Sequence, residues 1–207
     1  MAKLHVAPTK SSLLTLKRQR AFAEEGYDLL EQKREILILE LMNRLERARQ
    51  ADRKLAAAAQ RAFAALREAT LDAGSEALDR AALAVPAGHR VHVTSQHLMG
   101  LRVPRVKVEL QPPAAPFGVG GTSASTDAAM SRFLELLPLL AELAELENAV
   151  LRLAQELRKT QRRCNSLSKI FIPNYRETMD YIAGTLEERE RESFVILRMI
   201  RDRLAGG

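Results

Sequence analysis

The chain has few of the residues that build a large globular core. Tryptophan is absent from its 207 residues, and aromatic side chains make up only 4%. Aromatic side chains dominate the packing of most globular cores, whereas a sequence rich in Ala, Leu, Glu and Arg is typical of long paired helices. We therefore do not expect a large globular core.

Long uncharged apolar runs are also missing. The most apolar helical stretch, from Phe133 to Leu146, is interrupted by Glu135, Glu142 and Glu145, whereas a membrane-spanning helix needs about 20 predominantly apolar residues. The first eight residues have no apolar segment adequate for a secretory signal. We therefore predict a cytoplasmic location and no direct insertion into a membrane.

Residues that bind metals or act as nucleophiles are scarce. The single cysteine, Cys164, excludes an internal disulfide, and its heptad position favours a small packed residue over a nucleophile, although basic neighbours would lower a thiol pKa. His89, His92 and His97 lie close in sequence, but on a strand His92 and His97 point to opposite faces and no cysteine joins them. We expect surface histidines, no metal, no cofactor and no catalytic residue.

The sequence also lacks a phosphate-binding loop and a nucleic-acid reading motif. The Gly118-Val119-Gly120-Gly121 stretch has no following lysine, so it does not match a Walker loop. A formal net charge of +6 and a pI near 9.8 permit a nucleic-acid binder. However, basic residues alternate with acidic ones along most of the chain, without aromatic stacking platforms. We therefore predict no nucleic-acid partner and keep this function as the least favoured alternative.

What the sequence does contain is two long helical stretches, residues 10–72 and 127–204. At 1.5 Å per residue they would extend about 95 Å and about 115 Å, so we expect a rod. Candidate N-cap residues for the first stretch are Thr9, Ser11 and Ser12. Its apolar residues follow steps of three and four, which is typical of a coiled coil, with a stutter after Leu41.

The second stretch has a stronger apolar face and two internal prolines. Ser125, Thr126 or Asp127 would cap its beginning, and we predict a bend or a break near Pro138 and near Pro173 because each removes a backbone donor. The expected seam opens with Phe133, Leu137, Leu140 and Ala144, includes Cys164 and Phe171, and ends with Phe194, Leu197 and Leu204. The main seam residues across both stretches are predicted to be Leu16, Leu30, Leu37, Leu157, Leu167 and Ile182.

Between the helical stretches, residues 90–95 and 103–110 alternate apolar with polar side chains, which indicates half-buried strands. Met99-Gly100 is a plausible turn between them, and residues 112–121 are linker-like because of their prolines and glycines. An isolated two-stranded hairpin is marginal in water. We therefore expect it to lean on the helices or on another protein.

Because both helical stretches have seams and the middle segment is long enough to turn around, pairing within the chain is favoured over pairing between chains. The predicted fold is mainly α: a long antiparallel two-helix coiled coil formed by the N- and C-terminal arms, with a short central β-hairpin. The predicted organisation is an N-terminal tail at 1–9, an N-terminal coiled-coil arm at 10–84, a central β-hairpin and flexible linker at 85–126, and a C-terminal coiled-coil arm at 127–204.

Four groups of short motifs follow one another along the chain. They are Pro8-Thr9-Lys10, Leu13, Leu16-Lys17, Gly26, Leu29-Leu30 and Lys33-Arg34; Met99-Gly100 and Val103-Pro104; Arg162-Arg163, Asn165, Leu167, Ile172-Pro173, Thr178 and Tyr181-Ile182; and Glu187-Glu188, Arg191-Glu192, Phe194 and Leu197. In this order the set resembles the D subunit of the V-type and A-type rotary ATPases. The sequence departs from that pattern at Tyr175-Arg176, Cys164 and Ser166.

The resemblance implies the rotor shaft of the central stalk, a non-catalytic subunit. Its terminal helices would enter the catalytic hexamer of A and B subunits, and its middle would bind the small F subunit and rest on the funnel-shaped subunit that caps the membrane ring. Such a shaft couples ATP synthesis or hydrolysis to ion translocation, peripheral to the membrane. The alternatives are a non-rotary coiled-coil scaffold or an export-ATPase stalk, which lack the central β-hairpin.

Basic clusters near both chain ends are candidate contacts to acidic loops of other subunits. The residues expected at the bearing with the A/B hexamer are Lys10, Lys17, Arg18, Arg20, Arg191, Phe194, Leu197, Arg198 and Arg201. Those expected to bind the F subunit or the ring-cap subunit are Met99, Val103, Pro104, Phe133 and Leu137.

Overall fold

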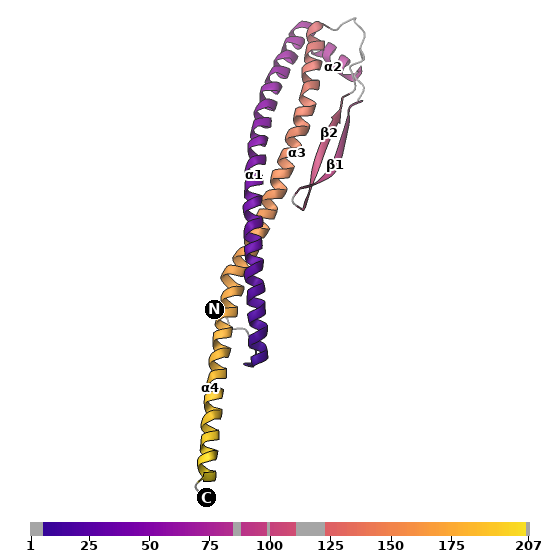
Figure 1. Ribbon diagram of the computed structural model, residues 1–207. Helices are drawn as coiled ribbons and strands as arrows, with labels where there is room; N and C mark the ends of the chain where they lie inside the picture. The colour runs from indigo at the N-terminus through magenta and orange to yellow at the C-terminus, as the bar shows by residue number, and fades with distance from the viewer. Residues whose placement is uncertain (1–5, 85–87, 99, 111–122, 206–207) are drawn as a thin grey trace. The chain divides into compact units, whose positions relative to one another are not determined.

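The computed structural model describes residues 6–84, 88–98, 100–110 and 123–205 (Figure 1). In chain order the elements are α1 (Lys10–Ala73), α2 (Ser75–Ala84), β1 (Arg90–Leu98), β2 (Leu101–Glu109), α3 (Ala124–Ser166), the π-helical segment η1 (Leu167–Phe171) and α4 (Ile172–Ala205). The predicted fold class is confirmed: long helices begin and end the fold, with a short β-hairpin between them. Met99 and the expected linker lie outside the described residues.

The chain divides into two compact units, and α1 and α3 contribute to both. The first unit contains the residues up to Leu37 together with those from Leu157 onward, and the second contains Ile38–Glu156. In the first unit, an ion pair joins Lys10 to Glu190 and a hydrogen bond joins Arg34 to Gln161. Residue numbers thus rise on one helix as they fall on its neighbour, which is antiparallel pairing.

Helix α1 has a clear signal at each end. At its beginning the Ser12 backbone N–H donates to Thr9 Oγ1 at 3.1 Å, so Thr9 is the N-cap among the expected candidates. At its end Gly74 adopts a φ of 82°, in the left-handed region that favours glycine. Because a Cβ at Gly74 would meet no atom within 4 Å, backbone conformation rather than space is what restricts this position.

In the first unit, the residues expected in the seam are buried to different extents. Leu16, Leu37 and Ile182 are buried, and Leu30, Leu157 and Leu167 are half-buried. Polar residues of small volume also lie in this seam, where Thr160, Cys164 and Thr178 are almost completely buried. Small side chains at a helix–helix contact allow the two backbones to approach closely.

In the second unit the core has two clusters. One combines Ala48 and Ala51 of α1 with Leu146 of α3, and the other combines Ala58 and Ala62 with Leu136. The Phe63 and Phe133 rings meet edge to face beside the second cluster, with centroids 5.5 Å apart. These pairs also run antiparallel, because higher numbers on α1 meet lower numbers on α3.

The expected seam was wrong at several positions. Leu140 is 48% exposed and Ala144 is exposed, because the face of α3 that packs carries Leu136, Leu139, Leu143 and Leu146 instead. Phe171 is also exposed, and Phe194, Leu197 and Leu204 have no packing partner on α1. Helix α3 also begins three residues earlier than expected, at Ala124.

The two prolines behave differently. Of the bend or break expected near Pro138, the break is absent, since α3 is continuous from Ala124 to Ser166. Pro138 is exposed, so the carbonyl left without a donor can be hydrated, while packed leucines on either side hold the helix. Before Pro173 the helix widens instead: the Ile172 backbone N–H bonds to Leu167 O, five residues back. Widening relieves the crowding that a proline ring causes in the preceding turn.

The central hairpin is confirmed, with Leu98 paired to Leu101 across a two-residue turn. Gly100 in that turn has a φ of 79°, as tight hairpin turns require. Figure 1 shows the hairpin beside α3, and two bonds attach it there: Val106 N–H donates to Glu145 Oε2 at 2.9 Å, and Arg152 Nη1 donates to Arg102 O. Strand β2 therefore packs against α3, whereas β1 is exposed along almost its whole length.

Two isoleucines of α4 provide a matched test of the seam. Ile182 is completely buried and Ile196 is 51% exposed. We predict that Ile182→Ala lowers the free energy of unfolding by about 2–5 kcal/mol, because it removes buried methyl groups and leaves a cavity. Ile196→Ala should change it by less than about 0.5 kcal/mol. Urea unfolding followed by circular dichroism measures both, and equal effects would contradict the assigned seam.

Candidate interface on α4

The last turns of α4 have no packing partner among the described residues. All side chains from Glu187 to Leu204 are exposed, and in Figure 1 α4 continues past the beginning of α1. Phe194 is 72% exposed and Leu204 is 80% exposed. Residues 191–204 are called here the α4 tip. Its exposed large apolar residues are Phe194, Val195, Ile196, Leu197, Met199, Ile200 and Leu204.

The apolar residues of the α4 tip point in most directions around the helix. At 3.6 residues per turn, Phe194, Leu197 and Leu204 share one side, Ile196 and Ile200 continue that side, and Val195 and Met199 lie on the other. A helix that is apolar nearly all round is normally buried by its surroundings, and an exposed apolar patch of this kind marks an interaction site. The geometry fits a socket that encloses the helix rather than a flat partner.

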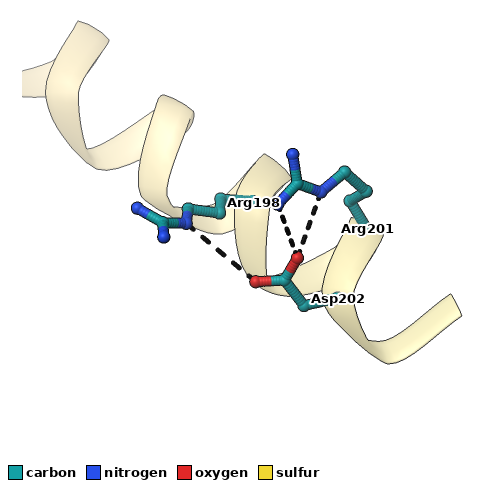
Figure 2. A network of polar contacts seen from close by, with 3 residues as sticks. All are labelled: Arg198, Arg201 and Asp202. Atoms are coloured by element: carbon teal, nitrogen blue, oxygen red, sulfur yellow. Dashed lines mark hydrogen bonds and ion pairs between the residues drawn. The ribbon is translucent and has the colours of Figure 1, made fainter. Parts of the chain in front are cut away.

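Charges on the α4 tip are mostly paired with each other. Figure 2 shows Arg198 and Arg201 turned toward Asp202: Arg201 donates to Asp202 Oδ1 from two nitrogens at 2.7 and 3.0 Å, and Arg198 Nε lies 4.0 Å from Oδ2. Arg191 forms ion pairs with Glu187 and Glu188. Exposed pairs of this kind add little stability, but each carboxylate offsets part of the positive charge of the neighbouring arginines.

At the beginning of α1, an ion pair and a hydrogen bond join this end of the chain to α4. Lys10 Nζ lies 2.7 Å from Glu190 Oε1, and Arg189 Nη1 donates to Pro8 O at 3.2 Å. The hydrogen bond to Lys10 and, after it, the positive charge of Lys10 lower the pKa of the Glu190 carboxyl. The same contact raises the pKa of the Lys10 ammonium. This pair marks where two-helix pairing stops and single-helix structure begins.

The structure brings the expected bearing residues together in the first unit, on the first turns of α1 and the last turns of α4. Lys17 and Arg18 are exposed, while Arg20 is half-buried and paired with Glu24 at 2.9 Å. Arg191, Phe194, Leu197, Arg198 and Arg201 all lie on the exposed end of α4. The two charge clusters are therefore available, although several of their members already have partners.

The second expected set lies in the other unit and is less accessible. Val103 is only 5% exposed, so this side chain packs inside the chain and is not presented to a partner. Phe133 is half-buried against the Ala58, Ala62 and Leu136 cluster. Pro104 and Leu137 are also half-buried, and Met99 lies outside the described residues.

Sequence reasoning missed four residues of the α4 tip: Val195, Ile196, Met199 and Ile200. Their apolar side chains are visible in the sequence, but the register of the two helices is not. Helix α1 begins at Lys10, and in an antiparallel pair Lys10 lies opposite Glu190, so apolar residues beyond 190 have no part of α1 to pack against. Only the observed register shows where the unpaired part begins.

A polar cluster lies within the seam around Cys164. Arg34 forms an ion pair with Glu31 and donates to Gln161 Oε1 at 3.3 Å, while its buried Nε has no partner among the described residues. Burial, and then the negative charge of Glu31, raise the pKa of the Cys164 thiol above its ordinary value. A buried neutral thiol is a packing residue and a poor nucleophile.

Two negative findings in the described ranges bear on function. No three His, Cys, Asp or Glu side chains gather there in a way that would hold a metal ion. No helix in the same ranges is long and apolar enough to cross a lipid bilayer.

Comparison with known proteins identifies the family. The family model for the D subunit of ATP synthase matches residues 12–202. The chain belongs to the ATP synthase D-subunit family. It is 36% identical to the V-type ATP synthase D subunit of Thermotoga neapolitana over 202 residues, covering 98% of this chain and 100% of the relative.

Other members of the D-subunit family agree over nearly the same length. The V-type ATP synthase D subunit 2 of Treponema pallidum is 41% identical over 201 residues, which is 97% of this chain and 96% of the relative. The A-type ATP synthase D subunit of Pyrococcus abyssi is 36% identical over 201 residues, covering 96% and 94%. The resemblance inferred from ordered motifs is therefore confirmed, and the family match includes most of the α4 tip.

For this member of the D-subunit family, the Lys10–Glu190 pair predicts a defined pH dependence. The contact stabilises fully between the ordinary pKa values of 4.5 for glutamate and 10.5 for lysine. Its contribution falls as the pH drops through the lowered pKa of Glu190 or rises through the raised pKa of Lys10. In Lys10→Gln the pKa of Glu190 should return toward its ordinary value. NMR titration of the Glu190 side chain measures this, and an unchanged pKa would contradict the pairing.

The Cys164 thiol should be almost inert in the folded protein. Because it is buried and its pKa is raised, we expect reaction with a thiol reagent such as 5,5′-dithiobis(2-nitrobenzoate) to be at least about tenfold slower than in urea. The absorbance of the released aryl thiolate measures the rate. Equal rates in the folded and unfolded protein would show that Cys164 is not in the seam.

Proposed function

We propose that this D-subunit family member is the central-stalk rotor shaft of a V/A-type ATP synthase or ATPase. It couples ATP synthesis or hydrolysis in the hexamer of A and B subunits to ion translocation through the membrane ring. The shaft itself is non-catalytic and peripheral to the membrane, as part of the complex. The α4 tip is the observation that carries this proposal, because its exposed apolar side chains lie nearly all round the helix.

The chemistry of the α4 tip suits a bearing. Apolar contacts are non-directional, so a helix held mainly by them can turn within a socket without breaking a fixed set of hydrogen bonds. Pairing of Arg191 with Glu187 and Glu188, and of Arg198 and Arg201 with Asp202, limits charges that would hold the tip at one angle. Exposed Lys17 and Arg18 can meet acidic loops at the rim.

The antiparallel seam supplies the stiffness that a shaft needs. Two helices packed along a shared buried seam resist torsion more strongly than a single helix does. Because the shaft is asymmetric, it makes different contacts with each catalytic pocket, and each rotation step changes which conformation each pocket prefers. The chain thus contributes positioning rather than bond-making.

The second unit, Ile38–Glu156, is the proposed site for the F subunit and for the funnel-shaped subunit that caps the membrane ring. Support comes from the apolar surface around Phe133 and Leu66, which lines a hollow of about 240 Å³ with Leu78 and Met130. The exposed strand β1 offers a second surface on the same unit.

The bearing proposal is tested by placing charges on the α4 tip. Phe194→Asp with Leu197→Asp should leave the helix content and folded stability of the chain almost unchanged, because both side chains are exposed. Binding to a purified A/B hexamer should weaken at least about a hundredfold, because carboxylates would be buried without partners. Gel filtration and ATP-driven ion pumping of the reconstituted complex measure the effect.

The matched control is Leu71→Asp with Leu83→Asp, which places the same two charges on exposed leucines of the other unit. It should enter the hexamer normally. The proposal fails if the double variant assembles and pumps like the unchanged protein.

A further inference from the structure

A charged crevice lies in the second unit between the hairpin and the helical pair. Its volume is about 570 Å³, within the range of small-ligand sites. Residues 105–108 of β2 form one wall, and residues of α1 and α3 form the other. All of these belong to Ile38–Glu156, so the crevice lies within one compact unit.

The crevice has more cationic than anionic side chains. Its basic residues are Arg44, Arg47 and Lys54 from α1 and Arg105 and Lys107 from β2; its carboxylates are Glu142 and Glu145 from α3. Arg44 is already paired with Glu40 at 2.8 Å, and Glu145 accepts a hydrogen bond from the Val106 backbone N–H. Within the described part of the chain, Arg47, Lys54, Arg105 and Lys107 form no ion pair.

Four cations that have no ion-pair partner among the described residues surround one hollow. They create a positive potential, because a cleft with low-dielectric walls concentrates the field of the charges that line it. A compact ligand with several negative oxygens would interact with cations on both walls. Arginine forks match phosphate oxygens in two-pronged geometry, and lysine adds a point charge. Lys107 and Arg105, two residues apart on one strand, share a face of β2.

We propose that this crevice binds a compact multivalent oxyanion of the diphosphate class, held between Arg47 and Lys54 of α1 and Arg105 and Lys107 of β2. The bound anion links the hairpin to the helices and adds to the attachment made by Glu145 and Val106. The anion site does not depend on the rotor role, since it rests on charges within one unit.

Inorganic pyrophosphate is the probe, titrated into the purified full-length chain by isothermal calorimetry without divalent cations. We expect one saturable site. Arg47→Gln with Arg105→Gln should weaken binding at least about tenfold, because one fork is lost from each wall. The matched control is Arg61→Gln with Arg67→Gln, two exposed arginines of α1 outside the crevice, and it should change the affinity less than about twofold.

A second measurement tests the link between hairpin and helices. Bound pyrophosphate should slow hydrogen exchange of backbone amides in β2, and this effect should vanish in the Arg47 and Arg105 double variant. If that variant does not fold by circular dichroism, Lys54→Gln and Lys107→Gln take its place in both assays.

Absence of saturable binding overturns the proposal, and so does an equal loss of affinity in the Arg61 and Arg67 control, which would show a diffuse charge effect only. The double variant Phe194→Asp with Leu197→Asp should bind pyrophosphate normally. Its behaviour separates a failure of the crevice from a failure of the bearing.

Discussion

Burial of a narrow seam between α1 and the returning helix is the interaction on which the rest of the structure depends. Leu37, Leu153 and Ile182 are almost completely removed from water, and alanines take over the seam in the second unit. With so few aromatic residues, no other core in the described chain can hold these helices. The seam also determines which faces of the helices can contact partners, because side chains outside it can be exposed to solvent.

The seam contains buried polar groups as well as a polar pair that spans the two helices. Thr160 and Thr178 are buried, and Thr178 satisfies its hydroxyl by donating to Asn174 O at 2.7 Å. Arg34 reaches across from α1 to Gln161. An apolar seam alone tolerates sliding by a heptad, whereas a polar pair across it is satisfied in one alignment only. That alignment places Lys10 beside Glu190 and leaves the α4 tip unpaired.

Each unit thus presents a different kind of surface. The α4 tip is apolar nearly all round, and most of its charged side chains pair with one another. The second unit presents a hairpin tied to α3 by two hydrogen bonds and a basic crevice beneath it. Because the hairpin is attached by few contacts, ligands or subunits that bind there can change how firmly it is held.

Sequence alone determined the two helical arms, the hairpin turn at Gly100 and the family, because periodicity, capping residues and ordered motifs are local properties of the chain. It did not predict continuity at Pro138, the exposure of Leu140 or the burial of Val103. Tertiary structure decided these, since packing on either side can hold a helix through a missing bond and only a neighbour can bury a face. The length of the bare α4 tip and the gathering of cations from α1 and β2 also depended on register. Register is set by contacts between residues far apart in sequence, so no local pattern contains it.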